Sequence, residues 1–375
     1  MNDERSFLAA MAVSPDDDLL RLAFADWLEE RGEDARAEFI RCQVGPARDE
    51  RRAEELLQAH REEWERPFRA AGAWVSFHRG LPWFLQIEAA RLPVAADVLG
   101  LAPEWNLYLT HQPEMYPRAF ARLAQAPHAD RIRGLTLLDG VTPDELEALL
   151  VPRVARRVRG LRFGYERMAD LLTATLRVPD LRLETLGFIG DRNEGLGDGG
   201  CRVIAGAERF ASLRGLALVV NGIGDGGAAA LAESAHLLRL ADLDLRHNYI
   251  TDDGLAALAE SSRLPGLRFL DVSLNEFGAA GILTLARSPC LARLSRLSLR
   301  GNPIGDEGAI ALAESAASAH LRGLEVGECE IGMAGFFRLL DSPHLAGVPR
   351  FSMSGNELSP EEQAELKQRF GDRVE

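Results

Sequence analysis

The sequence predicts an α/β fold, in which strand-and-helix repeats stack into a solenoid behind a separate all-helical module. Three observations support this prediction. The chain has 375 residues, more than one globular core ordinarily holds, so it divides into domains or extends as repeats. Leucines recur at a fixed interval of 27 residues in the second half of the chain. The first 72 residues lack this interval and place their apolar residues at helical spacing.

Residues 1–72 form the predicted helical module. We expect a short helix around Phe7, another around Phe39, and a long charged helix over residues 47–70. Between them an apolar stretch at helical spacing ends at Gly32, a typical C-terminal stop. Its members are Leu19, Leu20, Ala23, Phe24, Trp27 and Leu28. Such a module can cap the first repeat, which would otherwise expose apolar side chains and a strand edge.

Residues 73–375 form the predicted repeat array, which begins with degenerate units. Apolar pairs separated by one position mark its first strands, although their spacing varies. Residues 73–130 are the most degenerate part, because prolines between Leu92 and Met115 obscure the unit boundaries. A lengthened loop at residues 191–195 contributes to a longer step to the next unit. The pairs are Leu85/Ile87, Leu107/Leu109, Leu135/Leu137, Leu161/Phe163 and Leu186/Phe188.

The repeats are clearest over residues 210–360, where three columns recur every 27 residues. Two apolar columns are separated by one position, so both point to the same face of a short strand. The third column is asparagine, and we expect each amide to bond the backbone of its own turn and of the neighbouring coil. The columns are Leu216, Leu243, Leu270, Leu297, Leu324 and Phe351; Leu218, Leu245, Val272, Leu299, Val326 and Met353; and Asn221, Asn248, Asn275, Asn302, Cys329 and Asn356, with cysteine as a weaker substitute.

Glycine and aspartate mark the start of each predicted helix. Asp225, Asp252 and Asp306 stand just before it, and we expect each carboxylate to cap the exposed N–H groups of its own helix. The returning helices contain an Ala-Leu-Ala motif whose leucine packs against the strand leucines. Residues 351–375, with a charged helix at 360–370, are predicted to form a C-terminal cap. The glycine column is Gly227, Gly254, Gly281, Gly308 and Gly335.

The pattern Leu243-x-Leu245-x-x-Asn248-x-Ile250 resembles the leucine-rich repeat family, and the 27-residue unit is most similar to its ribonuclease-inhibitor type. The resemblance implies a right-handed horseshoe with a parallel β-sheet on the concave face and α-helices on the convex face. Residues 6–43, above all Ala25-Asp-Trp-Leu-Glu-Glu-Arg-Gly32, resemble the bacterial repeat-companion domain. That second resemblance implies a bacterial, intracellular protein and no particular chemistry.

Composition limits the classes of function. The net charge is −14, and an acidic surface repels phosphate backbones and anionic lipids, so we expect no nucleic-acid or membrane partner. No apolar run reaches the ~18–20 residues that span a bilayer. The N-terminus lacks the basic region of a secretory signal, so we expect a cytoplasmic protein. Lysine occurs once, at Lys367, which argues against P-loop phosphate binding and Schiff-base chemistry.

The motifs of common catalytic and metal sites are incomplete. Gly195-Leu-Gly-Asp-Gly-Gly200 is similar to a phosphate loop, but it occupies the turn of its repeat and no lysine follows. Asp191-x-Asn193-x-Gly195 is similar to a calcium loop, but Leu196 stands where that loop needs glycine. No histidine has metal-ligand spacing, and no Gly-x-Ser-x-Gly elbow is present. We expect free, buried thiols at Cys42, Cys201, Cys290 and Cys329.

The strand face opposite the leucines is the candidate binding site. The residue between the paired leucines points to the concave side in every unit, and so do the residues two positions away. The N-terminal half of this face is more apolar, with Tyr108, Tyr165 and Trp105 nearby. Two interpretations of the polar C-terminal half are open: a solvated sheet with internal Asp–Arg pairs, or a docking surface for a partner with basic residues and an apolar patch. Its residues are Asp242, Asp244, Arg246, Asp271, Ser273, Arg296, Ser298, Arg300, Glu325 and Ser352.

These observations favour a non-enzymatic scaffold that binds an unidentified protein partner through the concave face. Rigid in-register strands form a preorganised surface, which lowers the ordering cost of binding. Two alternatives stay open: an adaptor or regulator of an enzyme, similar to a ligase adaptor, and a hydrolase whose catalytic residues the sequence does not reveal. We expect a monomer without metal or cofactor. An enzyme should show a concentrated cleft with titratable residues, whereas a scaffold should show an open polar face.

Overall fold

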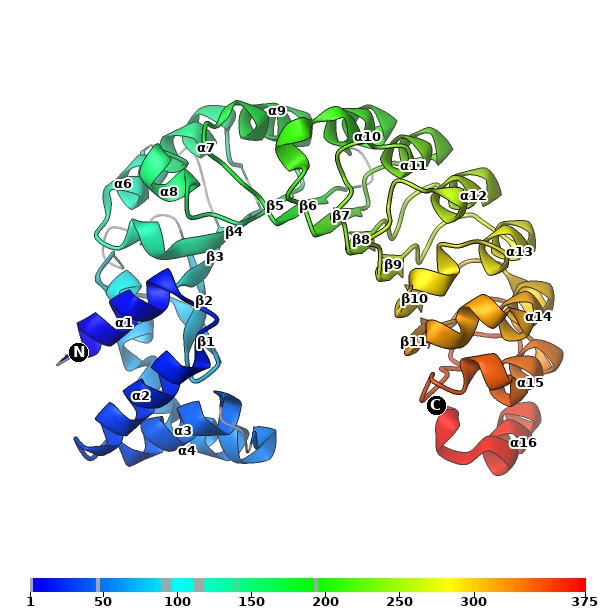
Figure 1. Ribbon diagram of the computed structural model, residues 1–375, viewed down its shortest axis with the longest axis horizontal. Coiled ribbons are helices and arrows are strands. Elements are labelled where there is room, and N and C mark those ends of the chain that lie inside the picture. The colour runs from blue at the N-terminus through cyan, green and yellow to red at the C-terminus, as the bar shows by residue number, and fades with distance from the viewer. Residues whose placement is uncertain are drawn as a thin grey trace. The chain divides into compact units, whose positions relative to one another are not determined.

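The chain folds into two compact units. The computed structural model describes residues 3–44, 48–88, 91, 96–110, 118–138, 140–191 and 195–375. The first unit comprises Met1–Arg162 and Thr173–Arg182, and the second comprises Phe163–Leu172 and Leu183–Glu375. Each unit combines helices with strands that follow one another in chain order (Figure 1). The predicted domain boundary at residue 72 stays a prediction.

Helices open the first unit: α1 (Glu4–Val13), α2 (Asp18–Glu29), α3 (Asp34–Val44) and α4 (Glu50–Ala70). Aspartates begin three of them, because their carboxylates accept hydrogen bonds from backbone N–H groups. Asp3 accepts from Ser6, Asp17 from Leu19, and Asp49 from Arg52. Phe7 and Phe24 lie in the core between α1, α2 and α3, with ring centroids 5.3 Å apart. The predicted helices are confirmed, but Leu19 is 76% exposed and does not join that core.

The strands of the first unit begin as a hairpin and continue in parallel. β1 (Trp74–His78) and β2 (Leu81–Glu88) pair antiparallel. Gly80 in their turn has a φ of +79°, and a Cβ there would lie 2.5 Å from the Cα of Ile40, so the turn requires glycine. β3 (Trp105–Thr110) and β4 (Ile132–Leu137) follow in parallel, with Leu85, Leu107 and Leu135 in register. The earliest degenerate units are therefore confirmed as strands.

Short helices return the chain between these strands: η2 (Ala96–Leu101), α6 (Ala119–Gln125), η3 (Ala129–Arg131), α7 (Pro143–Leu149) and α8 (Pro152–Ala155). A capping box begins α7, in which Thr142 Oγ1 accepts from the Glu145 N–H and the Glu145 carboxylate accepts from the Thr142 N–H. Both β5 (Gly160–Gly164) and α9 (Met168–Arg177) lie where the chain passes between the units.

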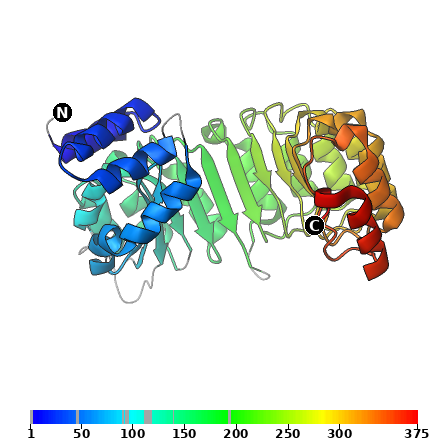
Figure 2. The ribbon, with the colours of Figure 1, turned by 90° about the horizontal axis from the view of Figure 1, so that it is seen from below.

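Parallel strands in chain order form the sheet of the second unit: β6 (Thr185–Ile189), β7 (Gly215–Val219), β8 (Asp242–Asp244), β9 (Phe269–Asp271), β10 (Arg296–Ser298) and β11 (Gly323–Glu325). The leucine column pairs directly, from Leu216 through Leu243, Leu270 and Leu297 to Leu324. Figure 2 shows these strands side by side from the face opposite the helices. The 27-residue interval of the sequence is thus the register of this sheet.

Helices cover one face of the second unit's sheet (Figure 1). They are α10 (Gly197–Gly206), α11 (Asp225–Ala232), α12 (Asp252–Glu260), α13 (Ala279–Ala286), α14 (Gly305–Glu314) and α15 (Met333–Asp341). Short 3₁₀ helices then lead back toward the strands: η4 (Glu208–Phe210), η5 (Leu291–Arg293), η6 (Ala316–His320) and η7 (Pro343–Leu345). The predicted α/β solenoid, with a parallel sheet on one side and helices on the other, is confirmed.

The apolar columns form a continuous core in the second unit. Leu243, Leu270 and Leu297 are at most 1% exposed and pair in register. One repeat cannot bury its own leucines, so each coil depends on its neighbours. The central leucine of each helix packs behind the strands and is fully buried, at Leu231, Leu258, Leu285, Leu312 and Leu339.

The asparagine column forms a hydrogen-bonded ladder between coils. Asn248 Nδ2 donates to the carbonyl oxygens of Leu218 and Leu245, both at 2.8 Å. Its Oδ1 accepts from the N–H groups of Asn221 at 2.9 Å and Ile223 at 3.1 Å. Asn275 and Asn302 repeat the amide contacts on the next coils. Cys329 Sγ instead donates to Leu299 O at 3.3 Å, so the predicted role of the column is confirmed.

The aspartates at the helix starts cap the next helix instead of their own. Asp252 Oδ1 accepts from the N–H groups of Gly278 at 2.9 Å and Gly281 at 2.8 Å, both at the start of α13. The predicted self-capping is therefore wrong, because each carboxylate lies beside the following coil. The contact also explains the glycine at position 281, since a Cβ there would lie 2.7 Å from Asp252 Oδ1. The same contacts join Asp225 to Thr251 and Gly254, and Asp306 to Gly332 and Gly335.

The second unit ends in the predicted charged helix, α16 (Pro360–Phe370), followed by η8 (Gly371–Arg373). Ser359 and Glu362 form a capping box at its start. The chain then turns back, so that Val374 forms a parallel β-bridge with Phe351, the last residue of the leucine column. Phe351 is fully buried as a result.

Candidate functional site

The ten residues of the predicted binding site, called the binding strip below, all lie in the second unit. They divide into three groups by the exposure of their side chains. Five members are exposed, namely Asp242, Arg246, Arg296, Arg300 and Glu325. Asp244 and Ser352 are half-buried. The remaining three are buried, with Asp271 8%, Ser273 6% and Ser298 2% exposed. These three residues therefore offer little side-chain surface to a partner.

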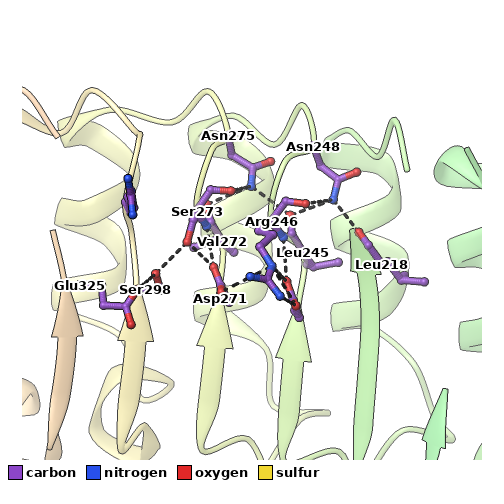
Figure 3. A network of polar contacts seen from close by, with 12 residues as sticks. Leu218, Leu245, Arg246, Asn248, Asp271, Val272, Ser273, Asn275, Ser298 and Glu325 are labelled. Carbon is purple, nitrogen blue, oxygen red and sulfur yellow. Dashed lines mark hydrogen bonds and ion pairs between the residues drawn. The ribbon is translucent and has the colours of Figure 1, made fainter. Parts of the chain in front are cut away.

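The buried members hydrogen-bond to one another across neighbouring strands (Figure 3). Ser273 donates its backbone N–H and its hydroxyl to Asp271 Oδ1. The hydroxyl oxygens of Ser273 and Ser298 lie 2.7 Å apart, and Ser298 donates to Glu325 Oε2 at 2.9 Å. Burying a polar group costs stability unless it is hydrogen-bonded. This row of contacts therefore fixes the side chains across β9, β10 and β11.

Asp244 and Arg246 form an ion pair within one coil. Arg246 Nη2 lies 2.8 Å from Asp244 Oδ2, whereas its Nε lies 4.0 Å from Asp271 Oδ2 on the next strand. Burial raises the pKa of Asp244, and the hydrogen bonds from Arg246 offset only part of that effect. Burial opposes the charge of Arg246, but its hydrogen bond to Asp244 raises the Arg246 pKa. The internal Asp–Arg pairs expected from the sequence are present, with the tighter contact inside one coil.

The sheet face consequently presents mixed charges instead of an acidic central column. Arg300 is held by Glu328, with Nη2 2.5 Å from Oε1. The guanidinium carbon of Arg296 lies 4.8 Å from the ring centroid of Phe269, a cation–π contact. Asp242 and Glu325 are the exposed carboxylates of the strip. A partner would therefore meet anchored arginines with carboxylates between them.

Exposed apolar side chains beside this strip were missed by the sequence analysis. Tyr249 is 58% exposed and Leu274 41% exposed, in the loops that follow β8 and β9. Leu274 has a φ of +54°, and its side chain lies against Gly301, where a Cβ would be 2.5 Å from it. Leu274 lies outside the two apolar columns that form the core. This position was the signal in the sequence that its side chain is exposed. We name Arg246, Tyr249, Leu274 and Arg300 the rim patch.

Of the aromatic residues expected near the sheet face, Trp105 lies in the core. It is fully buried, its indole N–H donates to Leu99 O at 3.0 Å, and its ring packs edge-on against Phe68. The expectation is wrong because Trp105 precedes Leu107 by two positions and so shares its inward face. Tyr108, on the opposite face of β3, is half-buried, and Tyr165 is 40% exposed.

The first unit contains a cavity of about 260 Å³ beside α3, α4 and the β1–β2 hairpin. Phe39, Trp64, Phe68 and Phe77 contribute aromatic walls. Arg36, also in the lining, forms ion pairs with Glu33 at 2.7 Å and Glu4 at 3.0 Å. The described lining includes no cysteine, serine, threonine or histidine. The described lining therefore lacks a serine, cysteine or threonine nucleophile, whereas Glu4, Glu33 and Glu63 line the same cavity.

All four cysteines are buried free thiols, as predicted. Burial raises the pKa of Cys201 to about 12 and that of Cys329 to about 11. Burial also raises the pKa of Cys42 and of Cys290. The thiolate is the reactive form of cysteine, and a raised pKa suppresses it. These side chains therefore serve packing instead of nucleophilic chemistry.

We expect no thiol of the folded protein to react rapidly with Ellman's reagent near neutral pH. The side chains are buried, and a pKa of about 11 at Cys329 leaves only a trace of thiolate. Guanidinium chloride should then release all four thiols together as the chain unfolds. Stopped-flow absorbance measures both phases. A fast phase before unfolding would show that at least one cysteine is accessible and reactive.

The glycine-rich segment after β6 forms the turn of its repeat. Leu196 N–H donates to Asn221 Oδ1 at 3.1 Å, and a Cβ on Gly195 would lie 2.3 Å from Asn221 O. The segment from Gly197 onward is already α10. These contacts support the structural interpretation of the motif that is similar to a phosphate loop. Asn193, part of the motif similar to a calcium loop, lies outside the described residues.

Among the residues that the structure describes, no three or more histidine, cysteine, aspartate and glutamate side chains gather as metal ligands would. In that same part of the chain, no helix has the length and hydropathy needed to cross a bilayer.

Several solved structures are similar to this chain at low identity. A chain of the Rad7 and Elc1 complex from yeast is 14% identical, with 96% of each chain covered and a TM-score of 0.47. An internalin from Listeria monocytogenes is 17% identical, covering 75% of this chain and 68% of its own, with a TM-score of 0.40. A Bacteroides fragilis protein is 15% identical, covering 68% and 69%, with a TM-score of 0.41. A comparison with curated protein sequences found no match.

The repeats themselves match a family model. The leucine-rich repeat model matches residues 240–259, 265–286 and 294–313. These segments contain β8, β9 and β10 with most or all of the helices that follow them, and the asparagine ladder runs through the same coils. The resemblance of residues 6–43 to the repeat-companion domain stays a prediction. Sequence match and repeat geometry agree that this part of the chain is built of leucine-rich repeats.

Proposed function

We propose that the chain is a non-catalytic scaffold that binds a protein partner through the sheet face of its second unit. Leucine-rich repeats support an interaction role, because stacked coils bring side chains from distant parts of the sequence onto one surface. The observation that carries the proposal is the fixed row over β8–β11. Buried hydrogen bonds hold Asp271, Ser273 and Ser298 in place, and exposed charges flank them.

The rim patch forms the centre of the proposed contact. Tyr249 and Leu274 supply exposed apolar area, and tyrosine and arginine are enriched among the residues that dominate binding energy. Arg246 and Arg300 are already anchored by Asp244 and Glu328, so a partner has fewer side chains to order. The proposed surface also includes Asp242, Arg296, Glu325 and Ser352. Of these residues, Glu325 is positioned by the hydrogen bond from the buried Ser298.

The remaining features support a protein as the partner. A net charge of −14 disfavours nucleic acid and anionic membranes. Four free thiols support a reducing, cytoplasmic location. We propose a monomer that works without metal or cofactor.

A paired substitution in the rim patch tests this proposal. The variant Tyr249→Ala with Leu274→Ala should lose capture of at least one protein from a lysate of the native organism. Both side chains are exposed, so the fold should be retained. Isobaric-label mass spectrometry of the eluates measures capture by wild type and variant in one experiment.

The matched control removes two exposed apolar side chains elsewhere in the second unit. Val203 is 45% exposed and Leu238 48% exposed, so Val203→Ala with Leu238→Ala should capture the same proteins as wild type. If no captured protein distinguishes the rim variant from this control, the rim patch is not the binding site.

A further inference from the structure

Exposed arginines stand on four successive coils where the chain enters the strands β8–β11. These residues are Arg239, Arg268, Arg296 and Arg322, and we name them the arginine edge. All four are exposed, and none lies within ion-pair distance of a carboxylate of the described chain. The nearby carboxylates are Asp242 at the start of β8, Glu260 at the end of α12 and Glu314 at the end of α14, and Glu314 pairs with Arg338. The positive charge of this edge is thus left without an ionic partner inside the unit.

Three of these arginines are held in position, two by hydrogen bonds to the backbone and one by a cation–π contact. Arg268 Nη1 donates to Leu267 O at 2.8 Å, and Arg322 Nη1 donates to Leu321 O at 3.0 Å. Arg296 stacks over Phe269. A guanidinium has five N–H donors, so the anchored arginines keep further donors directed away from the backbone. Anchored side chains lose less conformational entropy when they bind a ligand.

The opposite edge of the same unit shows a different use of charge. There the carboxylates of Asp225, Asp252 and Asp306 accept hydrogen bonds from helix N–H groups and so have a structural role. Removing them would leave backbone donors without partners. The arginine edge has no such ionic role, because its guanidinium groups hold only carbonyl oxygens or a ring. None of these guanidinium groups is neutralised by a carboxylate of the described residues.

We propose that the arginine edge binds a segment of a partner protein that is rich in aspartate and glutamate. Carboxylates complement guanidinium groups in charge and geometry. Successive coils lie about 4.8 Å apart, so Arg268 and Arg322 are separated by about 10 Å, the reach of about three extended residues. The net charge of −14 repels any polyanion, but it repels nucleic acid more strongly, because duplex DNA carries one charge per about 1.7 Å of its axis and an extended acidic peptide about one per 3.4 Å.

This site goes beyond the proposed function, since it lies where the strands begin and the rim patch lies where they end. Its test uses a synthetic ligand and does not require the partner of the sheet face. Arg296 also belongs to the proposed sheet surface, so the test leaves it unchanged. Failure of one proposal therefore leaves the other standing.

The experiment titrates a fluorescein-labelled peptide of alternating glutamate and aspartate with the full chain and follows fluorescence anisotropy. The test variant combines Arg239→Gln, Arg268→Gln and Arg322→Gln. We expect its dissociation constant to rise about tenfold, since each exposed ion pair contributes a factor of roughly two to four. The control combines Arg202→Gln, Arg338→Gln and Arg369→Gln, which are exposed arginines on helices α10, α15 and α16. It has the same net charge and should bind like wild type.

Three outcomes would overturn the proposal. They are no binding by wild type, equal weakening in test and control variants, and tighter binding of an oligonucleotide of the same charge than of the peptide. Thermal unfolding verifies that each variant is folded. If the triple variant is not folded, the three single variants replace it. Each should weaken binding about twofold to fourfold, and no change in any of them would equally reject the site.

Discussion

Asn248→Ala is expected to lower the free energy of unfolding by about 4 kcal/mol or more. Asn248 is 4% exposed, its amide nitrogen donates to three carbonyl oxygens, the two nearest on Leu218 and Leu245, and its amide oxygen accepts from two N–H groups. Alanine would leave the carbonyls of Leu218 and Leu245 and the N–H groups of Asn221 and Ile223 without these partners. Each buried group left unsatisfied costs about 1–3 kcal/mol, so the four losses together exceed the usual effect of a point mutation.

Urea unfolding followed by circular dichroism measures this loss. Tyr249→Ala is the matched control, because the next residue is 58% exposed and its truncation should change stability by less than about 0.5 kcal/mol. Asn248→Cys should fall between them, since Cys329 occupies the same column and its thiol still donates to the preceding coil. A loss below about 1 kcal/mol for Asn248→Ala would mean that water replaces the amide, and the ladder would then not hold the coils together.

The ladder connects local chemistry to the rigidity of the binding surface. Each asparagine amide joins its own coil to the preceding coil. The buried leucines therefore fix the spacing of the strands along their length, and the asparagines fix it where the strands end. Stability in a repeat array is a sum of nearest-neighbour terms. The rim patch residues follow the strands at this edge of the sheet, so the ladder also holds their backbone in place. A partner therefore meets a surface that is already formed.

The sequence alone was sufficient to predict the repeats of the second unit, because each column has a local cause. Leucines two positions apart share a strand face, and a spacing of 27 residues can be read directly from the chain. The cross-coil cap of Asp252 was not predicted, since it depends on which coil lies beside the carboxylate. A signal was nevertheless present in the sequence: a glycine stands 29 residues after each capping aspartate, at Gly254, Gly281 and Gly335.

The candidate site was harder to predict than the fold. Residue alternation places Asp271 on the sheet face, and it does lie there, but alternation says nothing of how neighbours cover it. Arg246 and Ser273 contact its carboxylate, so a position that looks solvated is 8% exposed. Leu274 shows the converse, because a leucine in a leucine-rich chain suggests a core residue and here it is 41% exposed. The exposure of one side chain depends on the side chains of neighbouring coils that cover it. The sequence of a single repeat therefore does not determine it.

Leu270→Ala is expected to destabilise the protein by about 2–5 kcal/mol. Leu270 is fully buried and stands in register between Leu243 and Leu297. Truncation removes three buried carbons and leaves a cavity between coils that backbone hydrogen bonds keep at a fixed distance. The site can therefore collapse little, which places the loss toward the upper part of that range. Urea unfolding measures it, and a loss near zero would show that the leucine column does not form the continuous core.

Leu274→Ala removes the same atoms four residues later and separates stability from binding. Its side chain is 41% exposed and packs on Gly301 at the surface, so its truncation should change the free energy of unfolding by less than about 0.5 kcal/mol. If the rim patch binds a partner, Leu274→Ala should nevertheless weaken capture, whereas any Leu270→Ala protein that stays folded should capture normally. The opposite pattern, with binding lost only when the core is damaged, would place the binding site outside the rim patch.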